Sequence, residues 1–285
     1  MLEIFKKAKE NKYAVGAFNV SNLEQLKAIV EAVQALKAPV IIATSKGEGK
    51  FIGKKQIRSL VDAYKQETGL DLILHLDHGK SFEIIQEAVE AGYDSVHFDG
   101  SELNLEENIQ LTKKIVNFAR ERGVGNIEGE LGYLRGGSKI HEAVEIKEED
   151  LTKPEQAADF IEKTGIDSLA VAIGNVHGIF KKGINPHLFL ERLKQINEKV
   201  GDKIALVLHG GSGTPEDDIK KVIELGINKI NVNTELRVAY TRALKKSLTE
   251  NPKLTTPYKI MPPVVEAVRE VVKTKIQLFK SNNKT

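Results

Sequence analysis

Short apolar or β-branched runs alternate with segments of helical period along the chain, and this alternation constrains the fold more than any other feature. Between the runs, segments such as 22–37, 81–92 and 104–123 repeat apolar residues every three or four positions, the period of an α-helix. Apolar strands that alternate with helices predict parallel strands covered by helices on their outer face. The predicted strands are 13–19, 38–45, 71–78, 93–99, 125–131, 167–175, 204–210 and 228–233.

Residues with capping preferences stand at the ends of the helical segments. Asn22, Ser81 and Asn104 are placed to accept backbone N–H groups at helix starts, and Gly92 and Gly123 follow helix ends. These positions predict where the three helices begin and end.

Eight strands in about 250 residues predict a closed (β/α)8 TIM barrel of the α/β class. The 285 residues then form a single domain over 1–285, with a flexible polar tail at about 280–285. A doubly wound open sheet is the alternative, but it normally carries a glycine-rich fingerprint after its first strand, and "AFNVSN" at 17–22 has none. A barrel predicts that the chemistry gathers at the carboxyl ends of its strands.

Composition excludes several classes of protein. Cysteine is absent, so the chain has neither disulfides nor thiolate metal ligands. The 42 Lys and Arg residues nearly balance the 40 Asp and Glu residues, which argues against a nucleic-acid or membrane-surface partner. The charged amphipathic start lacks the apolar stretch of a signal peptide, so we expect a cytoplasmic location.

Five of the seven histidines lie at or just beyond the predicted strand ends. In a closed barrel, side chains from distant strands meet at one mouth, where histidines and carboxylates would form a metal site. Three protein ligands and one open position are typical of catalytic zinc. A single histidine beside a strand is more often structural, which is our interpretation of His141 and His187. The five histidines at the strand ends are His75, His78, His97, His177 and His209.

Glycine-rich turns follow the sixth and seventh strands, at 175–183 and 209–218. Loops at this end of a barrel commonly bind phosphate with backbone N–H groups and a helix N-terminus. The alternative is that the glycines only make tight turns and that Ser212 or Thr214 caps a helix. Taken with the histidines, the turns favour a phosphorylated ligand, with candidate residues Gly210, Gly211, Ser212, Asn233 and Thr234.

Five motifs in order along the chain resemble one family. "HLDHG", "EGELGYLRGG", "AVAIGNVHG", "VLHGGSG" and "KINVNTE" are similar to motifs of the class II, zinc-dependent ketose-bisphosphate aldolases of the fructose-1,6-bisphosphate type. The resemblance runs from "YAVGAFNV" to the helix at 264–276. It implies reversible cleavage of fructose 1,6-bisphosphate to dihydroxyacetone phosphate and glyceraldehyde 3-phosphate, in glycolysis and gluconeogenesis. It also implies a homodimer or homotetramer.

The resemblance assigns one catalytic Zn²⁺ to His78, His177 and His209, with Glu130 sharing the metal in some members. The metal would polarise the ketone oxygen and stabilise the enediolate. Asp77 matches the acid/base that exchanges the proton of the C4 hydroxyl, a role for which we expect a raised pKa. His75 is expected to orient the set.

The resemblance also assigns the substrate-binding residues. One phosphate is expected near a monovalent cation, Na⁺ or K⁺, as in some relatives, and Asn19 and Ser45 are expected to line the pocket. Arg237 resembles a residue that grips the distal phosphate, in some relatives across a dimer. The residues matched to the first phosphate are Gly178, Lys181, Gly210 and Ser212, and those matched to the dihydroxyacetone part and its phosphate are Asn231, Asn233 and Thr234.

Two segments depart from the family pattern. In the loop at 136–150, Ser138 and Lys139 stand where an acidic residue usually follows the two glycines. Glu142 is therefore our candidate for the acid that protonates the enediolate carbon, with Glu145 second. The segment "YKIMPP" at 258–263 lacks an arginine that some relatives carry nearby.

Other functions stay open on the sequence alone. Asn233 favours a fructose-type enzyme, and tagatose 1,6-bisphosphate or a phosphorylated deoxy-keto-gluconate are the alternative substrates. A Schiff-base aldolase would need a desolvated lysine, for which Lys46 in a polar turn and Lys229 at the start of a strand are poor candidates. A non-catalytic metalloprotein that binds a sugar phosphate is the alternative of another class.

Overall fold

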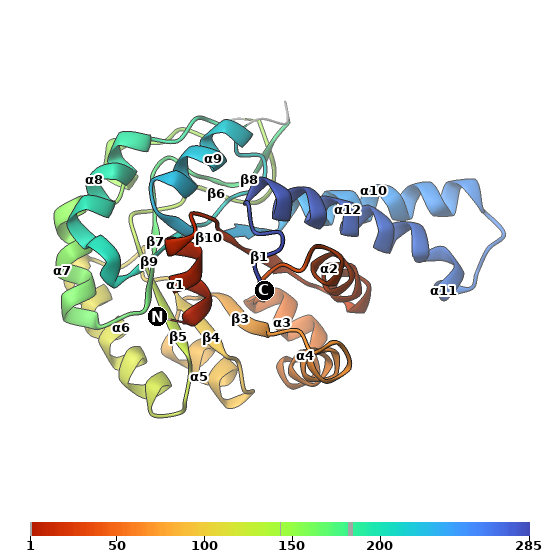
Figure 1. The fold of residues 1–285 in the computed structure, drawn as a ribbon, viewed down its shortest axis with the longest axis horizontal. Coiled ribbons are helices and arrows are strands. Elements are labelled where there is room, and N and C mark those ends of the chain that lie inside the picture. The colour runs from red at the N-terminus through yellow and green to blue at the C-terminus, as the bar shows by residue number, and fades with distance from the viewer. Residues whose placement is uncertain (1, 143, 182–184) are drawn as a thin grey trace.

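The computed structural model describes residues 2–142, 144–181 and 185–285. Its strands close into a parallel barrel in the order β1-β10-β9-β7-β5-β4-β3-β2, with helices around it (Figure 1). This confirms the (β/α)8 TIM barrel and excludes the open sheet. Each predicted run matches one barrel strand, with β3 ending one residue later and β10 beginning one residue earlier than predicted: β1 (Val15–Asn19), β2 (Val40–Ser45), β3 (Leu72–Gly79), β4 (Ser95–Phe98), β5 (Asn126–Leu131), β7 (Ser168–Val171), β9 (Ala205–Leu208) and β10 (Ile227–Val232).

Helices follow the strands and cover the outside of the barrel. Among the described residues, no helix combines the length and the apolar character that crossing a bilayer requires. The helices are α1 (Glu3–Glu10), α2 (Leu23–Leu36), α3 (Lys46–Ile52), α4 (Lys54–Thr68), α5 (Phe82–Glu90), α6 (Leu105–Arg120), α7 (Pro154–Thr164), α8 (Leu190–Val200), α9 (Glu216–Glu224), α10 (Thr234–Glu250), α11 (Pro257–Ile260) and α12 (Pro262–Leu278), with short 3₁₀ turns at Glu148–Asp150 and Gly201–Lys203.

The predicted helix starts are confirmed. The side-chain oxygens of Asn22, Ser81 and Asn104 each accept a hydrogen bond from the backbone N–H three residues later, at the starts of α2, α5 and α6. Each cap therefore satisfies a donor that the first helical turn leaves open.

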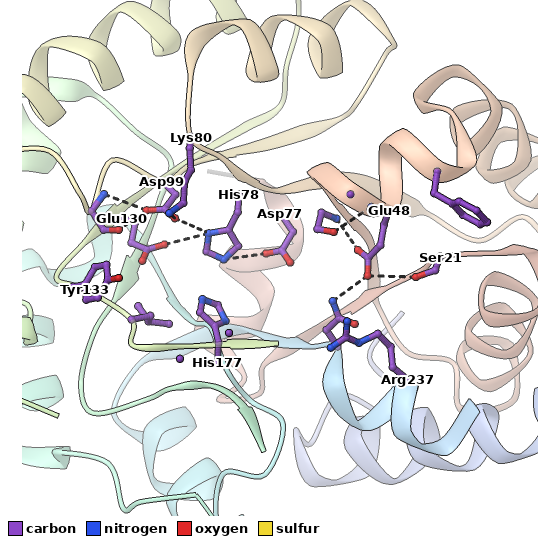
Figure 2. Close-up of a pocket in the computed structure, with 18 residues that line it drawn as sticks. Ser21, Glu48, Asp77, His78, Lys80, Asp99, Glu130, Tyr133, His177 and Arg237 are labelled. Carbon is purple, nitrogen blue, oxygen red and sulfur yellow. Dashed lines mark hydrogen bonds and ion pairs between the residues drawn. The ribbon is translucent and has the colours of Figure 1, made fainter. Parts of the chain in front are cut away.

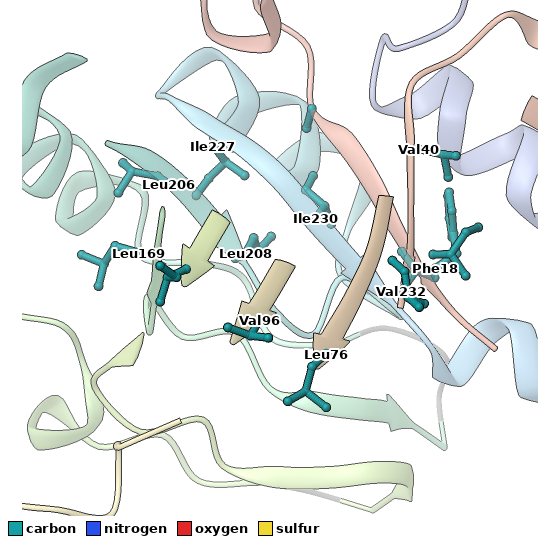
Figure 3. Close-up of a cluster of buried hydrophobic side chains, with 14 of the residues drawn as sticks. Phe18, Val40, Leu76, Val96, Leu169, Leu206, Leu208, Ile227, Ile230 and Val232 are labelled. Atoms are coloured by element: carbon teal, nitrogen blue, oxygen red, sulfur yellow. The ribbon is translucent and has the colours of Figure 1, made fainter. Parts of the chain in front are cut away.

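Alternate residues of each barrel strand point outward, and this outer set is mostly apolar, with Thr44 as a polar exception that is hydrogen-bonded to Tyr93. Figure 3 shows the outward side chains packed between strands and helices, including Phe18, Leu76, Val96 and Ile230, all of which are fully buried. The period of two along a strand gives each strand one such face. The main hydrophobic core is thus the layer between the barrel and its helices.

The inward-pointing residues divide the barrel interior into two levels. At the amino-terminal end, Val15, Ile41 and Ile73 pack against Phe5 of α1 in a small apolar cluster. Toward the carboxyl ends the interior is polar, although it is just as buried. The buried polar residues of this level are His75, Asp77, Ser95, His97, Asn126, Glu128, Glu130, Ser168, His209, Lys229 and Asn231.

Two further strands form a ribbon outside the barrel sheet. β6 (Gly136–His141) lies in the loop after β5 and β8 (His177–Phe180) in the loop after β7, and the two pair in parallel. The ribbon begins with Gly136 and His177, both of which line the cleft at the barrel mouth.

The C-terminal helices α10 and α12 run side by side and project from the barrel, joined through α11 (Figure 1). Beyond α12 the chain returns to the barrel. Ser281 is fully buried, and the backbone N–H groups of Asn283 and Lys284 donate to the carbonyls of Leu36 (2.8 Å) and Lys37 (3.0 Å). These contacts hold the tail against the end of α2, whereas its composition predicts a flexible end.

Candidate active site

The end of β3 brings two consecutive side chains into the same cleft. β3 pairs regularly with β2 as far as Asp77, but its register with β4 shifts between Leu76 and Gly79, so β3 carries one extra residue there. His78 within this bulge has φ 115°, a backbone conformation that residues other than glycine rarely adopt. Because the bulge breaks the alternation of the strand, Asp77 and His78 both face the cleft.

The cleft at the carboxyl ends of the strands has a volume of about 530 Å³ (Figure 2), and a smaller cavity of about 20 Å³ adjoins it. Asp77, His177 and Asn233 line both. The other predicted site residues in the cleft are Ser45, His78, Glu130 and Arg237, and those in the smaller cavity are Asn19, Gly178, His209, Gly210, Ser212, Asn231 and Thr234.

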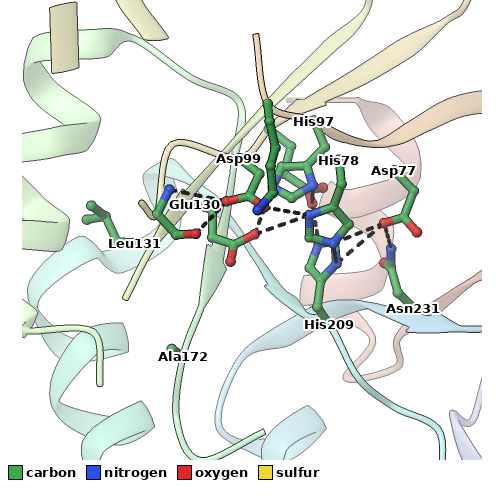
Figure 4. A network of polar contacts seen from close by, with 12 residues as sticks. Asp77, His78, His97, Asp99, Glu130, Leu131, Ala172, His209 and Asn231 are labelled. Atoms are coloured by element: carbon green, nitrogen blue, oxygen red, sulfur yellow. Dashed lines mark hydrogen bonds and ion pairs between the residues drawn. The ribbon is translucent and has the colours of Figure 1, made fainter. Parts of the chain in front are cut away.

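Histidines converge at the bottom of the cleft (Figure 4). His78 Nε2 lies 2.9 Å from His209 Nδ1, and the His78 ring is 4.3 Å from the His97 ring and 5.1 Å from the His177 ring, centroid to centroid. Potential ligand atoms of Asp77, His78, His97 and His209 all lie within 4.8 Å of one another. This donor set suits a transition metal such as zinc.

Unsatisfied buried atoms give a second indication of a metal site. Both ring nitrogens of His97 and Oε2 of Glu130 are buried without a well-aligned hydrogen bond, although His97 Nε2 lies 3.1 Å from Glu130 Oε2 as an ion pair. Glu130 also belongs to a second cluster of potential ligands with His78 and Asp99. Buried polar atoms normally have partners, so these residues fit a bound cation.

The expected ligand His177 lies outside both of these clusters. It begins β8 on the ribbon, and its ring centroid is 6.4 Å from that of His209. His97, which the sequence leaves as a supporting residue or a polar strand end, is within the first cluster instead.

Burial and the charges of the cluster shift the pKa values of its histidines in opposite directions. Burial lowers the pKa of His78, but the carboxylates of Asp77, Asp99 and Glu130 raise it more, to about 9. Burial, together with the charge on His78, lowers the pKa of His177 to about 4. One histidine of the metal-free cluster is therefore charged at neutral pH.

Asp77 is held by two asparagine amides. Asn19 Nδ2 donates to Oδ2 (2.9 Å) and Asn231 Nδ2 donates to Oδ1 (2.8 Å). Burial raises the pKa of Asp77, but the nearby imidazoles, above all the charged ring of His78, and the Asn19 hydrogen bond lower it more, to well below its ordinary value. The expectation of a raised pKa is thus wrong for this metal-free cluster, in which Asp77 is a carboxylate.

Glu48 is a residue of the cleft that sequence reasoning missed. Its carboxylate accepts hydrogen bonds from Asn19 Nδ2 (2.9 Å), from Asn233 Nδ2 (3.1 Å) and from the Ser45 N–H (2.7 Å). Glu48 and Ser45 form a capping box at the start of α3. The spacing of serine and glutamate in "SKGE" was the available signal.

Two more carboxylates, which the strand ends place at the mouth but to which the sequence assigns no individual role, contact the outer nitrogens of the clustered histidines. Asp99 Oδ2 lies 3.2 Å from His78 Nδ1, and Glu128 Oε1 lies 2.7 Å from His209 Nε2. Their positions near strand ends indicate that both carboxylates face the barrel mouth. Only the closed barrel shows which histidine each one contacts.

Glu142, Lys181 and Gly211 line neither cavity, and neither does the alternative acid Glu145. Glu142 forms an ion pair with Lys181, and both side chains are exposed outside the cleft. Gly211 is buried, and its N–H donates to the Asn231 carbonyl (2.9 Å). The first two come from the loops after β5 and β7, whose path the strand pattern does not determine.

The glycines of the smaller cavity have a structural reason of their own. Gly178 and Gly210 have φ of 93° and 70°, and a Cβ at either position would lie 2.2 Å from a backbone carbonyl oxygen. The positive φ and the close approach of a backbone oxygen together require glycine at both positions, as the tight-turn interpretation predicts.

Neither lysine considered for Schiff-base chemistry is suited to it. Lys46 is exposed at the start of α3. Lys229 lies inside the barrel rather than at a remote end, but its Nζ is 2.7 Å from Glu128 Oε2 and 2.9 Å from His75 Nε2. An ammonium engaged in this way is not the free amine that such chemistry requires.

Known proteins share both the sequence and the fold. The family Fructose-bisphosphate aldolase class-II matches residues 1–284. A fructose-bisphosphate aldolase of Thermus caldophilus is 42% identical over 301 residues, which cover 98% of this chain and 97% of that protein. The chain therefore belongs to the class II fructose-bisphosphate aldolase family. It is an enzyme, an aldolase of the carbon–carbon lyases.

Solved structures agree with this family. The YdjI aldolase of Escherichia coli K12 superimposes with a TM-score of 0.83 at 37% identity, over 98% of this chain and 96% of that one. A putative fructose-1,6-biphosphate aldolase of Coccidioides immitis does so with a TM-score of 0.87 at 30% identity, over 99% and 96% of the two chains.

Proposed function

We propose that the enzyme cleaves fructose 1,6-bisphosphate reversibly to dihydroxyacetone phosphate and glyceraldehyde 3-phosphate, with one Zn²⁺ held by His78, His177 and His209 and shared with Glu130. The observation that carries this proposal is the approach of His78 Nε2 to His209 Nδ1 (2.9 Å) directly beside Asp77. A metal bound there acts as a Lewis acid on the ketone oxygen.

Asp77 is the proposed base of cleavage. Its ionised carboxylate faces the cleft and can accept the proton of the C4 hydroxyl, and in the condensation direction the carboxylic acid returns that proton. The amides of Asn19 and Asn231 hold the carboxylate in one orientation, because each donates to a different oxygen. Positioning of this kind lowers the cost of aligning the base with the substrate.

The proposed site of the dihydroxyacetone phosphate group is at the smaller cavity, which at about 20 Å³ would have to widen when the substrate binds. α10 begins at Thr234, and Ser212 Oγ accepts a hydrogen bond from the N–H of Glu235 in its first turn (3.3 Å). A helix N-terminus favours an anion because its N–H groups and dipole point toward it. Gly178, Gly210, Asn231 and Asn233 complete this subsite in the proposal, with a Na⁺ or K⁺ ion beside the phosphate. Lys181 and Gly211 would join it only after rearrangement.

For the second proton transfer we propose Glu142, with Glu145 as the alternative. Glu142 is paired with Lys181 outside the cleft, so the loop after β5 would have to move inward when substrate binds. Ser45 and Arg237 both line the cleft and are the proposed contacts of the distal phosphate.

We further propose a cytoplasmic homodimer or homotetramer that acts in glycolysis and gluconeogenesis. The projecting α10–α12 hairpin supports an assembly, because Leu248 and Tyr258 on it are 46% and 75% exposed. Sedimentation equilibrium tests this, and a monomer at micromolar concentration would contradict it.

Steady-state cleavage assays test the main proposal. Fructose 1,6-bisphosphate and tagatose 1,6-bisphosphate are each assayed before EDTA, after EDTA, and after addition of Zn²⁺. We expect activity on the fructose substrate that disappears with EDTA and returns with zinc. Activity that is indifferent to EDTA would rule out the zinc site, and activity on tagatose 1,6-bisphosphate alone would change the substrate.

A further inference from the structure

Four side chains, three from strands and one from the end of a fourth strand, meet in the barrel interior below the cleft. Lys229 of β10 lies between Glu128 of β5 and His75 of β3, and Glu128 also contacts His209, which follows β9. All four are at most 1% exposed. An ion pair of lysine and glutamate at this depth is costly to desolvate, so it requires a reason beyond stability.

The contacts of this group determine which atom donates in each of them. Lys229 has only donors, so Glu128 Oε2 (2.7 Å) and His75 Nε2 (2.9 Å) must accept from its ammonium. His75 then carries its proton on Nδ1 and donates it to Ser95 Oγ (2.7 Å). Glu128 as a carboxylate has only acceptors, so its Oε1 must accept from His209 Nε2 (2.7 Å).

We propose that the Lys229–Glu128 pair is a positioning device for His209. By accepting from Nε2–H, Glu128 selects the tautomer in which His209 Nδ1 bears the lone pair, and Nδ1 is the atom that faces His78 Nε2 in the cleft. Lys229 keeps the other oxygen of Glu128 engaged. The inference rests on the proposed function in one respect, since it takes His209 as a metal ligand.

The wild-type enzyme supplies the first test. The ¹⁵N chemical shifts of the imidazole nitrogens of His209 are measured by NMR in the full-length, chelator-treated protein, with assignment by a His209→Gln variant. We expect the proton on Nε2 and an unprotonated Nδ1. A proton on Nδ1 of neutral His209 would overturn the proposal without any further variant.

Two substitutions then test the role of each partner. In Glu128→Gln, Lys229 still requires an acceptor and takes the amide oxygen, so the amide NH₂ faces His209 Nε2 and moves the histidine proton to Nδ1. Zn²⁺ affinity, measured by competition with a chelating dye, should fall about 10- to 100-fold, as for other residues that support metal ligands. In Glu128→Gln combined with Lys229→Met, the amide can turn its oxygen to His209, and we expect both the tautomer and most of the affinity to return.

Ser168→Ala is the matched control. Ser168 is equally buried in the same layer, and its Oγ donates a long hydrogen bond to Glu128 Oε2 (3.4 Å), so Ser168→Ala removes a neighbour of Glu128 without changing the oxygen that faces His209. A purely structural role predicts that Glu128→Gln changes the unfolding temperature while Zn²⁺ affinity stays within twofold of wild type. It also predicts that the double variant unfolds at a lower temperature and recovers no Zn²⁺ affinity relative to the single one. Either result would overturn the proposal. Failure of the proposed function shows itself separately, as wild-type protein that is inactive on sugar bisphosphates or active without metal.

Discussion

At the scale of single residues, the proposed chemistry depends on the four polar side chains that contact Asp77. Its two oxygens accept from Asn19 and Asn231, and its neighbours on the open side are His78 and His209. The same carboxylate is therefore held in place by neutral donors and kept ionised by positive charge. The orientation of Asp77 and its ionisation thus depend on different neighbours.

Substitution Asp77→Asn keeps the size of the side chain but removes the proton acceptor. We expect kcat for fructose 1,6-bisphosphate cleavage to fall by about 10²- to 10⁴-fold, the usual contribution of a positioned general base, with Zn²⁺ still bound. Asp71→Asn is the control, because Asp71 is 87% exposed just before the opposite end of the same strand. Comparable activity in the two variants would remove Asp77 from the mechanism.

Metal binding should release a proton, because the pKa of His78 is about 9 in the metal-free protein. At pH 7 this ring carries a proton that Zn²⁺ must displace. We expect release of about one proton per Zn²⁺ at pH 7, and an apparent affinity that rises about tenfold per pH unit up to about pH 9. Calorimetric titration at pH 7 in two buffers of different ionisation enthalpy measures this. Identical heats in both buffers would contradict the shifted pKa.

At the scale of elements, the strand ends differ from the strands themselves. β3 is regular along the apolar core layer. Only its last residues contain the bulge that turns both Asp77 and His78 toward the cleft. A non-glycine residue with φ 115° costs about 1–3 kcal/mol, which the surrounding packing must offset. Helix starts are simpler, because each depends on one local side chain.

The cap of α6 gives a prediction of that local kind. Asn104→Ala removes the acceptor for the Glu107 N–H (3.0 Å), and we expect the free energy of unfolding to fall by about 1 kcal/mol with kcat unchanged. Urea denaturation measures the difference. Lys113→Ala, at an exposed position of the same helix, should stay within about 0.5 kcal/mol of wild type. An Asn104→Ala variant as stable as this control would show that water replaces the cap.

At the scale of the whole molecule, the barrel encloses a polar level that the outer apolar layer stabilises. The pKa values of His75, His177 and His209 are lowered, chiefly by burial. Groups with lowered pKa values contribute stability above about pH 6.5, their unfolded value, and that stability is lost as the pH falls through the folded value. His78 acts in the opposite sense, but its contribution is already present below pH 6.5.

The metal-free protein should therefore lose stability on mild acidification. We expect a lower urea midpoint at pH 5 than at pH 7, with up to about 1.4 kcal/mol lost per pH unit for each histidine that stays neutral in the folded state. Equilibrium unfolding of chelator-treated protein at the two pH values measures the change. An equal or higher midpoint at pH 5 would mean that the three histidines take up protons without unfolding.

The sequence by itself determined the strands, the helix caps and the clustering of histidines at strand ends, because period and capping are local properties. Only the tertiary structure decided that His97 joins the His78–His209 cluster ahead of His177, that Glu48 links Asn19 to Asn233, and that Lys229 pairs with Glu128. These contacts join residues from separate elements of the barrel. Their distances follow from barrel closure, register and the bulge in β3, which no local pattern specifies.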